Sequence, residues 1–146
     1  MAQQFMSKLN ANERMALWGA VIVFIVSLIG TSWFTLVLSA AVIVVYYLKY
    51  SPTSNITWPM EVQLINLVLS GIIGLLALLG LIGLLGVGGV LGGLGFGGFG
   101  FFGGLFVIVL IGAIANAIGA GMMVLGTWRE YQAMPKAAPP PPPPTA

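Results

Sequence analysis

The chain has 146 residues, of which 59% are apolar and only 5% are charged, with a net charge of +2. Soluble domains carry about 25% charged residues, so this composition is that of a membrane protein. The few basic residues are too scattered to form a patch for nucleic acid. The sequence has no cysteine or histidine, which excludes disulfides, thiolate metal sites and histidine proton relays. We therefore expect an all-α membrane protein that partners the lipid bilayer and holds no cofactor, metal or nucleic acid.

The first 14 residues are mostly polar, with Phe5, Met6 and Leu9 as isolated apolar positions. Two interpretations stay open: a short helix at the membrane interface that buries these three side chains, or a frayed tail of the cytoplasmic N-terminal segment. Asn10 stands three residues before Glu13. This spacing is typical of a helix N-terminus.

Residues 15–48 contain no charge. One helix over this stretch would be about 51 Å long, whereas the hydrocarbon core of a bilayer measures about 30 Å. The Gly-Thr-Ser sequence at 30–32 predicts a turn near the midpoint, so we expect a helical hairpin with spans at 15–30 and 33–49. A cleaved secretory signal is the less favoured alternative, because its apolar run usually has about 7–15 residues.

Residues 50–60 form a polar connection in which Pro52 and Pro59 interrupt helices. Glu61 follows in the first turn of the next helix. Two roles fit an acid at this position: a proton or cation carrier, or a helix cap stabilised by the helix dipole. Capping is favoured, since carrier acids lie deeper in the bilayer and have a partner.

A third span at 62–85 carries a small residue at every third position from Gly71 onward. A step of three residues advances about 300° around an α-helix, so these positions trace a groove that winds around it. The ridges of a neighbouring helix fit such a groove, and small residues let backbones approach closely in lipid. The expected packing positions are Gly71, Gly74, Ala77, Gly80 and Gly83.

Residues 86–104 contain 11 glycines among 19 residues. Each glycine inside a helix costs about 1 kcal/mol relative to alanine, which argues against a regular helix. An apolar turn at the interface and a re-entrant loop are favoured over a further span. A phosphate-binding loop is excluded because the region has no Lys, Asp or Glu, and a collagen triple helix because it has no proline.

The fourth span, at 105–128, has small residues in four-residue steps beside an asparagine. Helices associate through such steps, either within one protomer or between subunits, and an asparagine adds an interhelical hydrogen bond. The tail at 129–146 contains six consecutive prolines and predicts an extended polyproline rod, favoured as a spacer over a recognition motif. The expected packing residues of the fourth span are Ala113, Asn116, Ala117 and Gly121.

Four spans with both termini in the cytoplasm place every basic residue on the cytoplasmic side, as the positive-inside rule requires. We therefore expect a multi-pass protein of the inner (plasma) membrane. The basic residues are Lys8, Arg14, Lys49, Arg129 and Lys136.

Asn12-Glu13-Arg14 before the first span, a tight first hairpin and Trp58-Pro59 before the third span form a pattern over about the first 85 residues. In this pattern the chain resembles small four-span bacterial membrane proteins without an assigned activity. The resemblance implies the four-span architecture and brings no catalytic residue, while the glycine repeat and the proline tail depart from it.

Two functions from different classes fit these observations. The first is a non-catalytic structural, accessory or assembly role through glycine-mediated helix packing, as a homo-oligomer or as a subunit of a larger membrane complex. The alternative is a holin-like or other pore-forming protein that permeabilises the membrane. An enzyme is not expected, since the sequence offers no nucleophile, base and orienting group within reach of one another.

Overall fold

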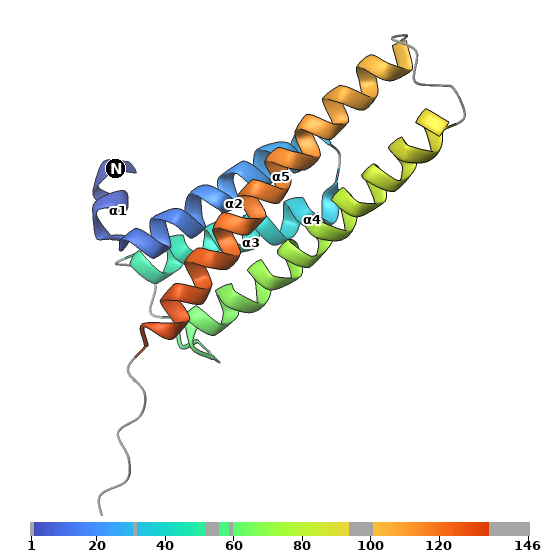
Figure 1. Cartoon of the computed structure of the whole chain (residues 1–146). Coiled ribbons are helices and arrows are strands. Elements are labelled where there is room, and N and C mark those ends of the chain that lie inside the picture. The colour runs from blue at the N-terminus through green and yellow to red at the C-terminus, as the bar shows by residue number, and fades with distance from the viewer. Residues whose placement is uncertain (1, 31, 52–55, 59, 94–100, 135–146) are drawn as a thin grey trace, which may run out of the picture.

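The computed structural model describes residues 2–30, 32–51, 56–58, 60–93 and 101–134. All regular structure in these ranges is helical (Figure 1). The proline-rich tail from residue 135 onward and the middle of the glycine-rich segment, residues 94–100, lie outside the described residues. The helices are α1 Ala2–Lys8, α2 Ala11–Ile29, α3 Trp33–Tyr50, α4 Val62–Gly93 and α5 Phe101–Gln132.

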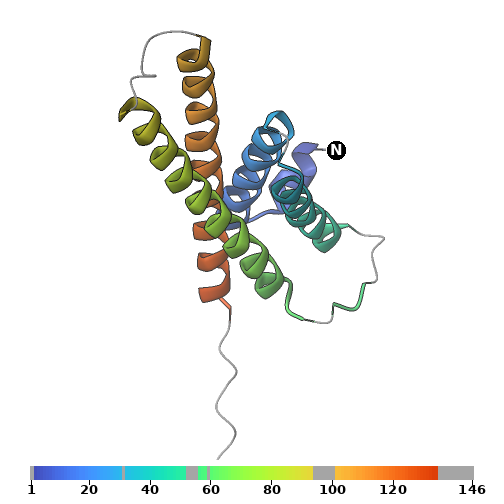
Figure 2. The same cartoon turned by 90° about the vertical axis from the view of Figure 1, so that its right-hand side faces the viewer.

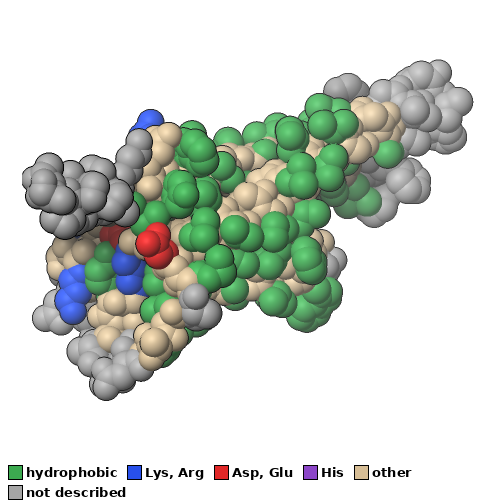
Figure 3. Space-filling view, turned by 90° about the horizontal axis from the view of Figure 1, so that it is seen from below, with side chains coloured by type: hydrophobic (Ala, Val, Ile, Leu, Met, Phe, Trp, Pro, Cys, Tyr) green, Lys and Arg blue, Asp and Glu red, His purple; other side chains and the backbone are tan. Residues whose placement is uncertain are grey.

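Four of these helices, α2 to α5, are long and apolar enough to cross a membrane. Charged side chains gather at one end of the molecule, and apolar side chains predominate over the rest of the described surface shown in Figure 3. Both observations agree with the expected all-α, four-span architecture. The chain is a multi-pass membrane protein, and we call the end that carries the charges the charged end.

The four helices form a short pair and a long pair. At about 1.5 Å per residue, α2 and α3, with 19 and 18 residues, are about 28 and 27 Å long. Helices α4 and α5 have 32 residues each, or about 48 Å. The long pair therefore extends well beyond the turn that joins α2 to α3 (Figures 1 and 2).

The expectation of irregular backbone throughout the glycine-rich segment was wrong at both of its ends. Helix α4 continues to Gly93, eight residues past the expected end at 85, and α5 begins at Phe101 instead of 105. In an apolar surrounding every backbone N–H and C=O needs an internal partner, and helical hydrogen bonds supply it. This requirement outweighs the cost of about 1 kcal/mol for each glycine.

The charged end begins with a capped helix start. The Asn10 side chain accepts a hydrogen bond from the Glu13 backbone N–H at 2.8 Å, and the Glu13 carboxylate accepts one from the Asn10 N–H at 2.8 Å. This reciprocal pair places the start of α2 at Ala11, four residues before the expected span. It also fixes the rotamer of Glu13, whose side chain is buried.

Helix α1 covers the charged end of the bundle. Leu9, just after it, is 3% exposed, and Phe5 and Met6 pack against the same core. The Arg14 Nε donates a hydrogen bond to the Met6 carbonyl at 2.9 Å. Of the two interpretations of this segment, the helix is the one observed, but its apolar side chains contact protein.

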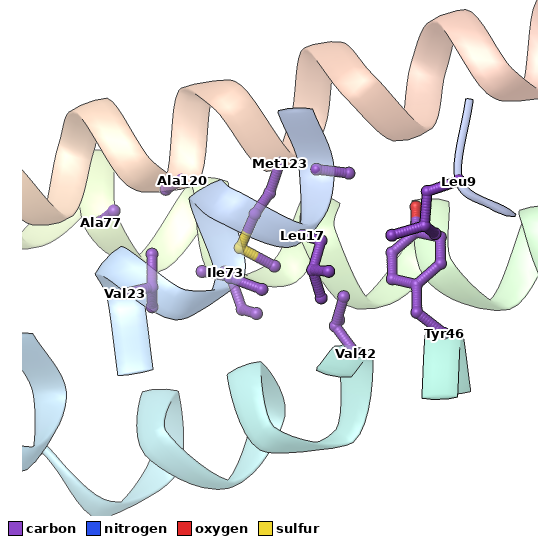
Figure 4. Packing of buried hydrophobic residues seen from close by; sticks show 11 residues of the cluster. Leu9, Leu17, Val23, Val42, Tyr46, Ile73, Ala77, Ala120 and Met123 are labelled. Atoms are coloured by element: carbon purple, nitrogen blue, oxygen red, sulfur yellow. The ribbon is translucent and has the colours of Figure 1, made fainter. Parts of the chain in front are cut away.

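Helices α2 to α5 pack in a ring, in which α2 and α4 each contact both α3 and α5. Met123 of α5 reaches toward Ile73 of α4, with Leu17 of α2 beside it (Figure 4). Val23 and Val42 are also fully buried. These side chains form an apolar layer across the middle of the ring.

Glycines bring α2 and α5 into backbone contact. A Cβ at Gly19 would lie 2.4 Å from the Gly119 carbonyl oxygen, and a Cβ at Gly126 would lie 2.6 Å from the Asn12 carbonyl oxygen. Backbone atoms cannot move aside as a flexible side chain can. Neither position was among the packing residues expected from the sequence, although at both of them the backbones of two helices touch.

Replacing Gly126 by alanine is expected to lower the free energy of unfolding by about 1–3 kcal/mol, because the added methyl group overpacks the contact with α2. The measurement is helix loss on titration of the detergent-solubilised chain with a denaturing detergent. Gly121→Ala, on the same helix, is the matched control, since a Cβ at Gly121 meets nothing within 4 Å. It should leave stability unchanged or raise it by up to about 1 kcal/mol. Equal effects of the two substitutions would contradict this account.

Candidate functional site

Five buried or half-buried side chains meet at the charged end, and we call them the charge cluster. At its centre, the Lys49 Nζ lies 2.6 Å from Glu13 Oε1 and 2.9 Å from Glu130 Oε1. The two carboxylates are 1% and 5% exposed, whereas the lysine is 21% exposed. The members of the charge cluster are Glu13 of α2, Tyr46, Lys49 and Tyr50 of α3, and Glu130 of α5.

Two tyrosines complete the hydrogen bonding of the carboxylates. The Tyr46 hydroxyl donates to Glu130 Oε2 at 2.9 Å, and the Tyr50 hydroxyl lies 2.6 and 2.7 Å from the two oxygens of Glu13. The Lys49 Nζ also lies 5.4 Å from the centre of the Tyr50 ring, within the range of a cation–π contact. The buried charges are therefore paired and hydrogen-bonded, as burial requires.

Helix geometry explains why these residues meet. Positions 46, 49 and 50 are related by steps of three and four, so they share one face of α3. Glu13 lies in the first turn of α2 and Lys49 in the last turn of α3, and each position suits the sign of its charge with respect to the helix dipole. The cluster thus ties α2, α3 and α5 together where α3 and α5 end and α2 begins.

The chemistry of the charge cluster is that of a structural ion-pair network. Each charged group is engaged by the others, so none of the three is left as an unpaired acid or base. No group of three or more His, Cys, Asp or Glu residues in the described ranges is placed to hold a metal ion. Two carboxylates sharing one ammonium group still leave a formal charge of −1 in a largely buried site.

Asn66 of α4 lies beside the Tyr46 hydroxyl and is fully buried. Neither its amide nitrogen nor its amide oxygen makes a hydrogen bond within the described residues. One turn deeper, the Ser70 and Thr127 hydroxyls lie 2.7 Å apart and share a hydrogen bond between α4 and α5. Asn66 is therefore a buried polar side chain whose contact with the Tyr46 hydroxyl does not reach hydrogen-bond geometry, next to groups that are well paired.

Sequence reasoning placed Glu13 before the first span and Lys49 at the end of the second, and it did not single out Glu130 or bring the three residues together. It examined Glu61 instead, which the structure leaves exposed at the start of α4. The Glu61 backbone carbonyl accepts hydrogen bonds from Leu64 and Ile65. The expected four-span topology already puts residues 13, 49 and 130 at the same end, and this is the signal that could have paired them.

The structure separates the expected packing residues into inward-facing, open, half-buried and cavity-lining positions. Gly74 and Ala77 face inward: a Cβ at Gly74 would lie 2.8 Å from Val124 Cγ2, and Ala77 is 6% exposed. Gly71, Gly83 and Gly121 are open, with nothing within 4 Å of a built Cβ. Ala117 is half-buried. Gly80, Ala113 and Asn116, together with Ala77, line a cavity.

This cavity lies between α3, α4 and α5 and has a volume of about 390 Å³. It is at the opposite end of the short pair from the charge cluster, since Ser32 and Thr35 at the start of α3 form part of its wall. Most of its other lining residues are apolar. The Asn116 amide oxygen is buried and makes no hydrogen bond within the described residues.

Comparison with known proteins adds no assignment. No protein-family model, no curated protein and no solved structure matches this chain.

Replacing Lys49 by methionine is expected to lower the free energy of unfolding by about 3–5 kcal/mol, because two buried carboxylates lose their shared cation. The measurement is the same titration with a denaturing detergent, in which the helix content is monitored. Lys8→Met is the control, since Lys8 is exposed on α1. A loss no larger for Lys49→Met than for Lys8→Met would show that the charge cluster does not hold the helices together.

Asn66→Leu is expected to raise the free energy of unfolding by about 1–3 kcal/mol, because it replaces an unpaired buried amide with an apolar group of similar size. The midpoint of thermal unfolding in mild detergent measures this effect. Ser70→Ala is the comparison, since it breaks the hydrogen bond to Thr127 and should lower the midpoint. A lower midpoint for Asn66→Leu would mean that the amide has a partner that stabilises the fold.

Proposed function

We propose that this chain is a non-catalytic membrane assembly protein. The charge cluster holds the helices of one protomer together, and the outer face of α4 packs against the same face of a second copy. The observation that carries the proposal is the set of open glycines on α4. Nothing lies within 4 Å of a built Cβ at Gly71, Gly83 or Gly86.

Exposed glycines on a lipid-facing helix call for a physical reason. Each costs about 1 kcal/mol of helix stability relative to alanine. Within the described part of the protomer, no close packing at these three positions offsets that cost. Apolar side chains gain little by leaving the bilayer. A glycine groove therefore stabilises an assembly only when the backbone of another helix packs closely against it.

Length supports a second copy as the partner. Helix α4 is about 48 Å long, and an ordinary span of about 20 residues would leave much of it uncovered. A second copy supplies a helix of equal length. A two-fold axis along the membrane normal would bring the two α4 helices together in the same orientation.

Charge also supports this partner. Helix α4 has no charged residue between Val62 and Gly93, so shape and length alone select what packs on it. The proposal places the charged end in the cytoplasm and the protein in the inner membrane, because Lys8, Arg14, Lys49 and Arg129 all belong to that end. Assembly then occurs among copies with the same orientation.

The test is disulfide cross-linking in native membranes, which the absence of cysteine from the sequence makes straightforward. Gly83→Cys and Gly86→Cys should form disulfide-linked dimers on mild oxidation. Ile118→Cys on α5, at a site that is 57% exposed, is the control and should remain monomeric. Combining Gly86→Cys with Gly83→Leu should reduce the dimer several-fold, since a bulky side chain fills the groove.

Two outcomes would contradict assembly through α4. One is the absence of dimers from both cysteine variants of α4. The other is equal cross-linking from Ile118→Cys, which would indicate random collision. Pore formation, the alternative from the sequence, predicts release of a small dye from vesicles that contain the protein. Assembly predicts cross-linking without release.

A further inference from the structure

We infer that the cavity between α3, α4 and α5 is a binding site for a membrane-soluble amphiphile, an apolar chain that carries one hydroxyl group. Three features of the cavity support this: its size and origin, the unpaired amide on its wall, and the chemistry of the remaining lining. Each concerns residues that the charge cluster and the outer face of α4 do not use.

Small residues create the cavity. Ala77 and Gly80 of α4 and Ala113 of α5 lie on its wall, and a Cβ at Gly80 would meet nothing within 4 Å. Larger residues at these positions would fill the space. The resulting volume of about 390 Å³ falls within the range of about 300–1,000 Å³ that is usual for small-molecule sites.

Asn116 supplies a polar contact within this space. Its side chain lines the cavity, and its amide oxygen is buried and makes no hydrogen bond within the described residues. A side-chain amide carries two donors and one acceptor, and rotation of the amide plane exchanges their positions. A hydroxyl group can satisfy either, because it both donates and accepts.

The other polar groups of the wall are already engaged. The Thr35 hydroxyl lies 2.8 Å from the Ser27 hydroxyl and 2.7 Å from the Ser32 hydroxyl, within hydrogen-bonding distance of both. The unused hydrogen-bonding capacity of the cavity is therefore concentrated at Asn116. This favours a ligand with a single polar group over a sugar or another polar metabolite.

The rest of the lining is apolar and carries no charge. Phe34, Leu76, Leu81, Leu84 and Val109 contribute to it, and the α4 and α5 residues belong to membrane-spanning segments. A ligand that reaches this site comes from the bilayer. Water alone would gain few hydrogen bonds here, since a bound water needs two to four polar partners.

The test measures binding of dodecan-1-ol and of dodecane to the full chain in mild detergent, by the concentration dependence of the thermal unfolding midpoint. The alcohol should raise the midpoint and bind about tenfold more tightly than the alkane, which matches one hydrogen bond. In Asn116→Leu the two probes should bind with equal affinity. If dodecan-1-ol and dodecane bound the unchanged chain with the same affinity, Asn116 would have no role in binding.

Gly80→Leu fills the cavity and should abolish binding of both probes. Gly112→Leu is the matched control, because a Cβ at Gly112 also meets nothing within 4 Å but Gly112 does not line the cavity. It should bind as the unchanged chain does. Binding that survives Gly80→Leu, or that Gly112→Leu also removes, would place the probe elsewhere and overturn the inference.

The cavity lies within one protomer. The binding test can therefore fail or succeed independently of the cross-linking test for assembly. Gly83→Leu, which should weaken the contact between copies, should leave binding of dodecan-1-ol unchanged. Loss of cross-linking with retained binding would refute the assembly proposal alone. Loss of binding in Gly83→Leu would show that the site needs a second copy and would overturn the inference as stated.

Discussion

The fold depends on one lysine shared by two buried carboxylates. Lys49 connects the start of α2 to the end of α5 through Glu13 and Glu130, and two tyrosines satisfy the remaining oxygens. Hydroxyl pairs also join neighbouring helices, Ser70 with Thr127 one turn below the cluster at 2.7 Å and Ser27 with Thr35 near the turn between α2 and α3 at 2.8 Å. Because apolar surface gives little driving force between helices in lipid, these polar contacts fix which helices are neighbours and at what depth.

Glycine serves two opposite purposes in this molecule. At Gly19 and Gly126 it removes a side chain so that the backbones of α2 and α5 touch. At Gly83 and Gly86 it leaves an uncovered groove on the surface of α4. Between these extremes, Gly80 lines a cavity that is open to the surface. The same residue type therefore closes one contact, opens another and shapes a cavity, depending on what the neighbouring helix places opposite it.

Because the role of a glycine depends on the neighbouring helix, the sequence predicted the spans better than the contacts between them. The length of the uncharged stretches predicted four spans, and the spacing of Asn10 and Glu13 matched a capping pair that the structure contains. The extension of α4 to Gly93 was missed, because propensity measured in water underestimates helices that have no water to bond. The charge cluster was missed since its members are far apart in sequence, and only helix rotation decides whether Lys49 points inward.

The unequal helix pairs impose two hydrophobic thicknesses on a single membrane. Lipid that fits the short pair, about 28 Å, is far thinner than the roughly 48 Å of the long pair. A helix that is too long for its bilayer tilts, or thickens the lipid around it, at a cost that grows with each ångström of mismatch. One side of this protein is thus matched to ordinary lipid, whereas the other side requires either helix tilt or thicker lipid around it.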